Sequence, residues 1–192
     1  YANGFMGRFQ NSLSILSYLT KESGIDKELE IIIVEWNPIA GKKKLKEDLI
    51  LHKNIDVRII EVPNDIHKKV RATKYDAPNG ETIPFYEFIG KNVAVRRANS
   101  DFVLTTNPDI IFNKSLIKYF AKKELSKDNF YRIDRDNLLH NVDSSMSIEK
   151  QLILFDKDLD KKLQAKNQIC RKRYVHTKAS GDFLLSPKWA FE

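Results

Sequence analysis

Asn107, Pro108 and Asp109 are the residues of this chain whose types and spacing best suit ligand chemistry. They follow residues 102–106, an apolar run with β-branched and aromatic residues that is typical of a buried strand. Because proline cannot continue a central strand, an amide and a carboxylate come just past the carboxyl end of this strand, where open α/β sheets bind ligands. Their oxygens suit a hard cation or a cation-bound phosphate. On spacing alone, an ordinary turn is the simpler interpretation, since all three residue types are common in turns.

The elements that would position these residues alternate along the chain. Apolar residues at spacings of three or four indicate helices, and dense β-branched runs indicate strands. Gly24 is predicted to end the first helix. The pattern predicts helices over residues 5–19, 42–50, 85–93, 115–125 and 148–155, and strands over residues 30–34, 57–62, 102–106, 130–134 and 183–185. Residues 63–84 contain three prolines and predict a long surface loop, in which His67 is expected to be exposed.

This alternation favours a single α/β domain over residues 1–192, with a mostly parallel central sheet flanked by helices. Residues 30–34 form a nearly continuous β-branched run, which is typical of a strand buried on both faces. Ligands should then collect near polar residues at the carboxyl ends of strands. These residues are Glu35, Asn37, Asn107 and Asp109.

Composition limits the class of partner and the compartment. The 33 Lys and Arg residues outnumber 26 Asp and Glu residues and give a formal net charge of +7, which favours anionic partners such as phosphates. Cys170 is the only cysteine, so no intrachain disulfide is possible and a reducing compartment is expected. No apolar run approaches the roughly 18 residues of a spanning helix, and no signal peptide is visible. We therefore expect a location in the cytoplasm or at the cytoplasmic face of a membrane.

Several common site motifs are absent from the sequence. There is no Gly-rich dinucleotide fingerprint, no Walker-type phosphate loop and no Gly-x-Ser-x-Gly nucleophile elbow. One cysteine and four scattered histidines give no zinc-ligand spacing. Aromatic and basic residues do not interleave as a single-strand binding platform requires, so no specific nucleic acid is expected.

Three segments resemble the GT-A class of nucleotide-sugar glycosyltransferases, and the family 2-like members most closely. Residues 30–37 look like the second strand of that family, which ends in an acidic residue that contacts the nucleoside, here Glu35. The passage from Asn92 through Asp109 is similar to the segment that carries the family's Asp-x-Asp motif. Gly181 and Asp182 look like the turn on the acceptor side. As a set, these segments also resemble an uncharacterised group of glycosyltransferase-like proteins.

The resemblance implies a Rossmann-like GT-A fold and a hexosyltransferase-like enzyme. Such an enzyme moves a sugar from a nucleotide-diphosphate donor to a glycan, protein or lipid acceptor. Asp109 and Asn107 would hold Mn²⁺ or Mg²⁺ at the diphosphate. The nucleotide-sugar-binding residues implied in this way are Glu35, Asn37, Asn92, Asn107, Asp109, Arg132 and Arg135. A surface ion pair with a neighbouring aspartate is an equally good interpretation of either arginine.

The chain departs from the family pattern at the motif and at its ends. Asn107 replaces the first aspartate of Asp-x-Asp, so a cation would be held with less charge. The family's first strand would precede Tyr1 and its catalytic base would follow Glu192. Either those parts lie outside this chain or Asp182 is the catalytic candidate. His176 is better explained as an exposed loop residue than as a diphosphate ligand.

These departures keep two other function classes open. The first is a non-catalytic nucleotide- or glycan-binding module on the same fold, which the loss of the motif aspartate and of a visible base suggests. The second is a basic nucleic-acid binder, suggested by the charge of +7 and the cluster at residues 171–173. The absence of a recognisable nucleic-acid motif makes this second class the weakest.

Overall fold

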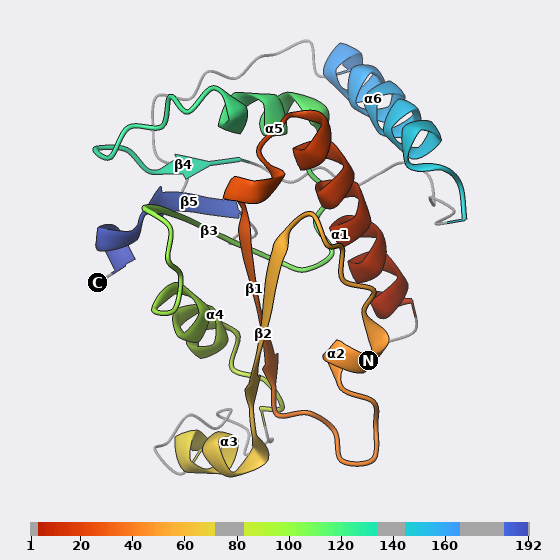
Figure 1. Cartoon of the computed structure of the whole chain (residues 1–192). Coiled ribbons are helices and arrows are strands. Elements are labelled where there is room, and N and C mark those ends of the chain that lie inside the picture. Colours follow the sequence, from red (N-terminus) through yellow and green to blue (C-terminus); the bar gives the residue numbers. More distant parts are fainter. Residues whose placement is uncertain (1–3, 72–82, 134–144, 166–182, 192) are drawn as a thin grey trace. The chain divides into compact units, whose positions relative to one another are not determined.

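The computed structural model describes residues 4–71, 83–133, 145–165 and 183–191 (Figure 1). The chain divides into two compact units, and each is described by itself. The first unit contains Tyr1–Asp26 and Leu104–Ser186, and the second contains Lys27–Val103 and Pro187–Glu192. The prediction of one domain over the whole chain stays a prediction. None of the helices in the described ranges is long and apolar enough to cross a membrane.

Helix α1 (Phe5–Glu22) begins the first unit and agrees with the prediction of a helix over residues 5–19. Its apolar stripe is buried, and Ile15 and Leu19 are fully inaccessible to solvent. Gly24 ends the helix as predicted, with a φ of +71° that favours glycine. Its N–H donates to the carbonyl of Lys21, as in common helix caps that place a glycine after the last turn.

Two further helices, α5 (Lys114–Ala121) and α6 (Ile148–Ala165), pack against α1. Ile117 of α5 and Phe155 of α6 are buried. Gln151, also in α6, is 1% exposed, and its side-chain oxygen accepts a 2.8 Å hydrogen bond from the amide of Asn11. The buried side-chain amide of Gln151 therefore has a hydrogen-bond partner, as buried polar groups usually do.

Most residues of a three-stranded sheet belong to the first unit, and its strands run in the order β3, β5, β4 (Figure 1). Its strands are β3 (Phe102–Thr106), β4 (Tyr131–Arg132) and β5 (Phe183–Pro187). β4 and β5 are antiparallel, with Tyr131 opposite Leu185. The buried side chains of Phe183 and Leu185 show that one face of β5 lies in the core.

The second unit is built on a parallel pair of strands, β1 (Glu30–Trp36) and β2 (Asp56–Val62). Their register aligns Trp36 with Val62, so both strands end together. Helix α4 (Glu87–Val95) packs against β1. Two shorter helices, α2 (Leu45–Asp48) and α3 (Asn64–Arg71), follow β1 and β2 respectively, and short 3₁₀ helices lie at Asp26–Glu28 and Lys188–Phe191.

The core of the second unit gathers where β1 and β2 end. Trp36, Val62 and Tyr86 are buried there together. His67 of α3 is 4% exposed, and its ring lies 5.2 Å from the ring of Tyr86. The prediction that His67 is exposed is therefore wrong. The expected exposure followed from the prediction of a loop over residues 63–84. That loop prediction is wrong over Asn64–Arg71, which form α3, and residues 72–82 lie outside the described residues.

The mixed α/β class and most predicted elements are confirmed, but the predicted central sheet is not found among the described strands. Those strands form one two-stranded parallel sheet and one three-stranded antiparallel sheet. The order of helices and strands along a chain indicates where each strand lies in the sequence, but it does not indicate which strands pair in a sheet. β1 is also mostly half-buried rather than buried on both faces, and only Ile33, Glu35 and Trp36 of this strand are buried.

Candidate functional site

Residues 107–110, here called the Asp109 turn, follow β3 in the first unit as the sequence predicts. The N–H of Ile110 donates to the carbonyl of Asn107 at 3.4 Å, which closes the turn. The side chain of Asp109 is 30% exposed. A partly exposed carboxylate therefore lies just past the carboxyl end of a strand, with an amide two residues before it.

Arg8 of α1 meets this carboxylate, and the sequence analysis did not identify it. Its Nε lies 3.2 Å from Oδ2 of Asp109, although the two residues are 101 positions apart in the chain. The side chain of Arg8 is 56% exposed. The sequence around a single arginine on a helix does not indicate its partner. Only the folded structure shows that the guanidinium of Arg8 lies beside the carboxylate of the Asp109 turn.

Two neighbours on α1 help to position the guanidinium of Arg8. Its Cζ lies 5.9 Å from the centre of the Phe5 ring, within the range of cation–π attraction. Gly4, at the start of the helix, has a φ of +82° that disfavours any side chain there. A Cβ at this glycine would lie 3.6 Å from Nη1 of Arg8, so the guanidinium rests directly beside the backbone.

Ser12 fixes the same turn one helical turn further along α1. Its hydroxyl donates to the carbonyl of Ile110, the residue after Asp109. Residues four apart share a helix face, so Arg8 and Ser12 contact adjacent residues of the turn from one side of α1. Ser12 is buried and Ile110 is half-buried, so this second contact is partly shielded from solvent.

The oxygen groups of the Asp109 turn are too few to bind a metal ion without further ligands from a substrate or water. Among the described residues, no group of three or more His, Cys, Asp or Glu side chains is placed to hold a metal ion. The turn supplies one carboxylate and one amide. Mg²⁺ commonly binds through one or two carboxylates together with substrate phosphates and water. The residues present therefore fit a cation that is held largely by a bound diphosphate.

Glu35 lies in the second unit with its carboxylate turned into the protein. The residue is 4% exposed, and its Oε1 accepts a 3.0 Å hydrogen bond from the N–H of Leu45 at the start of α2. This contact satisfies one of the N–H groups that a helix start leaves without a partner inside the helix. The contact gives Glu35 a structural role; the predicted contact with a nucleoside stays a prediction.

Asn37 joins the ends of β1 and β2 in the second unit. Its N–H donates to the carbonyl of Val62 at 2.7 Å, and its side-chain oxygen accepts from Asn64 at 2.8 Å. Its φ of +51° is tolerated by asparagine better than by most residues. Asn92 is exposed on α4, where its side-chain oxygen accepts a 3.1 Å hydrogen bond from Arg96.

The predicted site residues are thus divided between the two units. Asn107, Asp109 and Arg132 belong to the first, while Glu35, Asn37 and Asn92 belong to the second. The structure brings Asn107 and Asp109 into one turn. Arg135, His176 and Asp182, together with the basic cluster at residues 171–173, lie outside the described residues.

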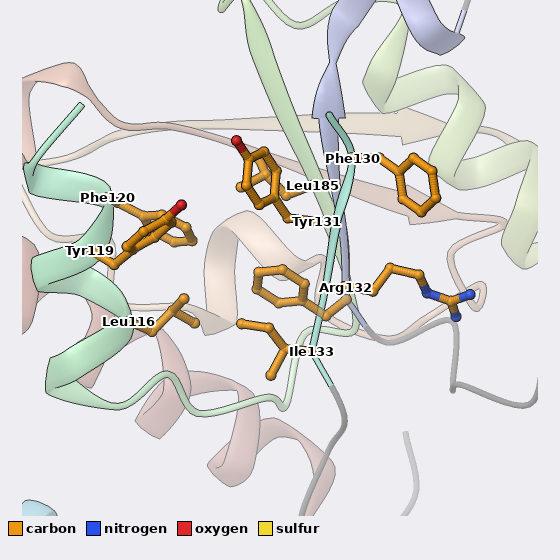
Figure 2. A pocket seen from close by; sticks show the side chains of 9 residues that line it. Leu116, Tyr119, Phe120, Phe130, Tyr131, Arg132, Ile133 and Leu185 are labelled. Atoms are coloured by element: carbon orange, nitrogen blue, oxygen red, sulfur yellow. The ribbon is translucent and has the colours of Figure 1, made fainter. Parts of the chain in front are cut away.

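An aromatic pocket of about 300 Å³ lies between α5 and β4 in the first unit (Figure 2). Tyr119 contributes to its wall from α5, and its ring centre is 6.5 Å from that of Tyr131. Figure 2 shows Tyr131 and Ile133 on the α5 side of β4, while the guanidinium of Arg132 points away from α5. Arg132 therefore borders the pocket without placing its charge among the aromatic rings.

The aromatic pocket is connected to the segment that follows the Asp109 turn. Phe183, which lines the pocket, packs edge-on against the buried Phe112 with ring centres 6.3 Å apart. The volume of this pocket is at the lower end of the range for small-molecule sites. Comparison of the chain with protein-family models, curated proteins and solved structures found no match.

Proposed function

We propose that this chain is a glycosyltransferase that binds a nucleotide-diphosphate sugar at the Asp109 turn. The observation that carries the proposal is the 3.2 Å contact between Nε of Arg8 and Oδ2 of Asp109 at the carboxyl end of β3. A carboxylate that suits a cation and a guanidinium that suits a phosphate lie side by side. The proposal includes a GT-A-like arrangement of the chain, to which the resemblance of residues 30–37 and 92–109 lends support.

The roles within the turn follow from the chemistry of its side chains. Asp109 offers oxygen to Mn²⁺ or Mg²⁺, and the amide of Asn107 offers a neutral oxygen. A divalent cation bound there would stabilise the charge that develops on the departing diphosphate. Arg8 donates to phosphate oxygens through a planar group that matches their geometry. Asp182 remains the catalytic candidate of the sequence, without an assigned role, and it lies outside the described residues.

The aromatic pocket is the proposed position of the acceptor, which would be a glycan, protein or lipid group. Tyr119 lines the pocket and is 37% exposed, and its side chain offers such an acceptor both an aromatic ring and a hydroxyl group. The packing of Phe183 on Phe112 supports a location close to the segment after the Asp109 turn.

The proposal is tested by thermal unfolding with nucleoside diphosphates and nucleotide sugars, each with and without Mn²⁺. A ligand that binds only the folded state raises its stability, by about 2.7 kcal/mol at a concentration one hundred times Kd. We expect Asp109→Ala to lose the metal-dependent part of this stabilisation. Asp128→Ala is the matched control, because Asp128 is an exposed aspartate of the same unit outside the turn.

Sugar transfer and donor hydrolysis are then measured on the same three proteins. Loss of turnover in Asp109→Ala, with normal turnover in Asp128→Ala, would support transferase chemistry at the turn. Equal metal-dependent stabilisation and equal turnover in both variants would remove Asp109 from the site.

A non-catalytic binding module is the second candidate, and the same ion pair favours it. Arg8 already neutralises Asp109, so an anionic ligand needs no metal to approach the turn. This candidate predicts that nucleotides raise the unfolding temperature equally with and without Mn²⁺. It also predicts no turnover with any donor sugar.

A further inference from the structure

We infer that Arg8 makes metal binding conditional on the donor, because it covers Asp109 until a diphosphate draws its guanidinium away. The inference rests on the proposed function for its diphosphate and assigns Arg8 two successive partners. In the free protein the partner is Oδ2 of Asp109, at 3.2 Å. In the complex the partner is a phosphate oxygen. Metal and diphosphate then strengthen the binding of one another.

The exposure of both side chains allows this exchange. Arg8 is 56% exposed and Asp109 is 30% exposed, so the pair is partly hydrated and held weakly. A divalent cation that approaches Asp109 alone must displace the guanidinium from one carboxylate oxygen. A ligand with two adjacent phosphates offers Arg8 more negative charge than the single carboxylate does, and guanidinium groups bind phosphates in a bidentate manner.

The turn keeps its shape when Arg8 leaves, because other contacts hold it. The buried hydroxyl of Ser12 donates to the carbonyl of Ile110, and Asn107 and Ile110 close the turn through the backbone. Asp109 therefore stays in place for a cation after the ion pair opens. The ring of Phe5 and the bare backbone of Gly4 keep Arg8 near the turn throughout.

The test measures ligand binding to the full chain in four variants. These are Arg8→Ala, Asp109→Ala, the double variant, and Lys114→Ala as the matched control. Lys114 of α5 forms a 2.6 Å ion pair with Glu22 of α1, the helix that carries Arg8, and the side chains of Lys114 and Glu22 are similarly exposed. Glu22 lies fourteen residues after Arg8, or about 21 Å along the helix axis. The control therefore removes one positive charge and one α1 ion pair at a distance from the turn.

Free Mn²⁺ is followed by electron paramagnetic resonance, first alone and then with inorganic pyrophosphate or UDP. We expect Arg8→Ala to bind Mn²⁺ alone roughly two- to fivefold more tightly, because the competing ion pair is gone. We expect its affinity for pyrophosphate in the presence of Mn²⁺ to fall roughly tenfold. Lys114→Ala should follow the wild type in both measurements, and the double variant should lose the gain in Mn²⁺ affinity.

The possible outcomes separate this inference from the proposed function. If UDP and Mn²⁺ bind together but Arg8→Ala matches Lys114→Ala, the role of Arg8 is wrong while the proposed function stands. If neither UDP nor pyrophosphate binds, the donor proposal fails and the diphosphate half of the inference fails with it. The covering of Asp109 is then judged on Mn²⁺ alone, and unchanged or absent Mn²⁺ binding in Arg8→Ala overturns it.

Discussion

The indole N–H of Trp36 donates a 3.0 Å hydrogen bond to Nδ1 of His67 in the core of the second unit. Both residues are buried, with exposed fractions of 7% and 4%. The bond links the end of β1 to the middle of α3 and gives the indole nitrogen of Trp36 and Nδ1 of His67 a partner. Since buried polar groups are costly without partners, this pair fixes how α3 packs against β1.

Replacing Trp36 with phenylalanine should destabilise the second unit. The change leaves Nδ1 of His67 buried without its donor, at a cost of about 1–3 kcal/mol. The smaller ring adds a further loss through imperfect packing. Urea titration measures the free energy of unfolding. Trp189→Phe is the control, because Trp189 is 63% exposed and its loss should change stability by about 0.5 kcal/mol or less. Equal stability in the two variants would contradict the structural role of the bond.

Helix α3, which carries His67, is a part of the fold that the sequence did not predict. Prolines and charges around residues 63–84 favour a loop, and α3 has a polar sequence in which few apolar residues mark a helix. Its position depends on Trp36, which lies 31 residues earlier than His67. Helices such as α1, by contrast, carry a long apolar stripe, so their prediction needed no knowledge of a distant partner.

Glu35 gives a prediction that separates a structural role from nucleoside binding. Glu35→Ala removes the acceptor for the N–H of Leu45 at the start of α2, so we expect a loss of about 1–3 kcal/mol in the free energy of unfolding. Glu35→Gln keeps a side-chain oxygen and should lose less. Both values come from chemical denaturation. A fall in nucleotide affinity in Glu35→Gln without any loss of stability would instead support the predicted nucleoside contact.

The candidate site was only half predictable for a similar reason. Asp109 follows a recognisable strand and a proline, so its position at a strand end could be read from a few adjacent residues. Arg8 reaches the same turn from the other end of the chain, and no local pattern distinguishes it from an ordinary surface arginine. The pairing of the strands could not be predicted from local sequence patterns either. β3 pairs with β5, which follows about 80 residues later, and the hydroxyl of Thr105 donates to the carbonyl of Leu184.

Glu149 at the start of α6 should make the first unit sensitive to acid. A hydrogen bond from its own backbone N–H, and then one from the hydroxyl of Ser147, lower the pKa of its carboxyl group. Because the pKa is lower in the folded state, the carboxylate stabilises this state above the unfolded value of about 4.3. That contribution is lost as the pH falls through the folded pKa.

Glu149→Gln should therefore lower the unfolding temperature at pH 7 and lose less stability than the wild type on acidification. The measurement is the unfolding temperature from pH 7 down to pH 3. Glu124→Gln is the control, because Glu124 is an exposed residue of the same unit outside any helix. If the two variants have the same pH profile, the hydrogen bonds of Glu149 do not contribute to stability.

Ser12 and Ser14 offer a matched pair on α1 for testing how the Asp109 turn is held. The hydroxyl of Ser12 donates to Ile110 of the turn, whereas the hydroxyl of Ser14 donates to the carbonyl of Gln10 within the helix. Ser12→Ala leaves the carbonyl of Ile110 without this donor and should cost about 1–3 kcal/mol. Ser14→Ala should cost less, because a helix carbonyl keeps its backbone partner.

The two serine variants should also differ in ligand binding. Loosening the turn moves Asp109 relative to Arg8, so Ser12→Ala should weaken the binding of Mn²⁺ with pyrophosphate, while Ser14→Ala should leave it unchanged. Calorimetric titration at a temperature well below unfolding separates this effect from loss of folded protein. Equal affinity in both variants, alongside a clear loss of stability in Ser12→Ala alone, would mean that the serine supports the fold without positioning the carboxylate.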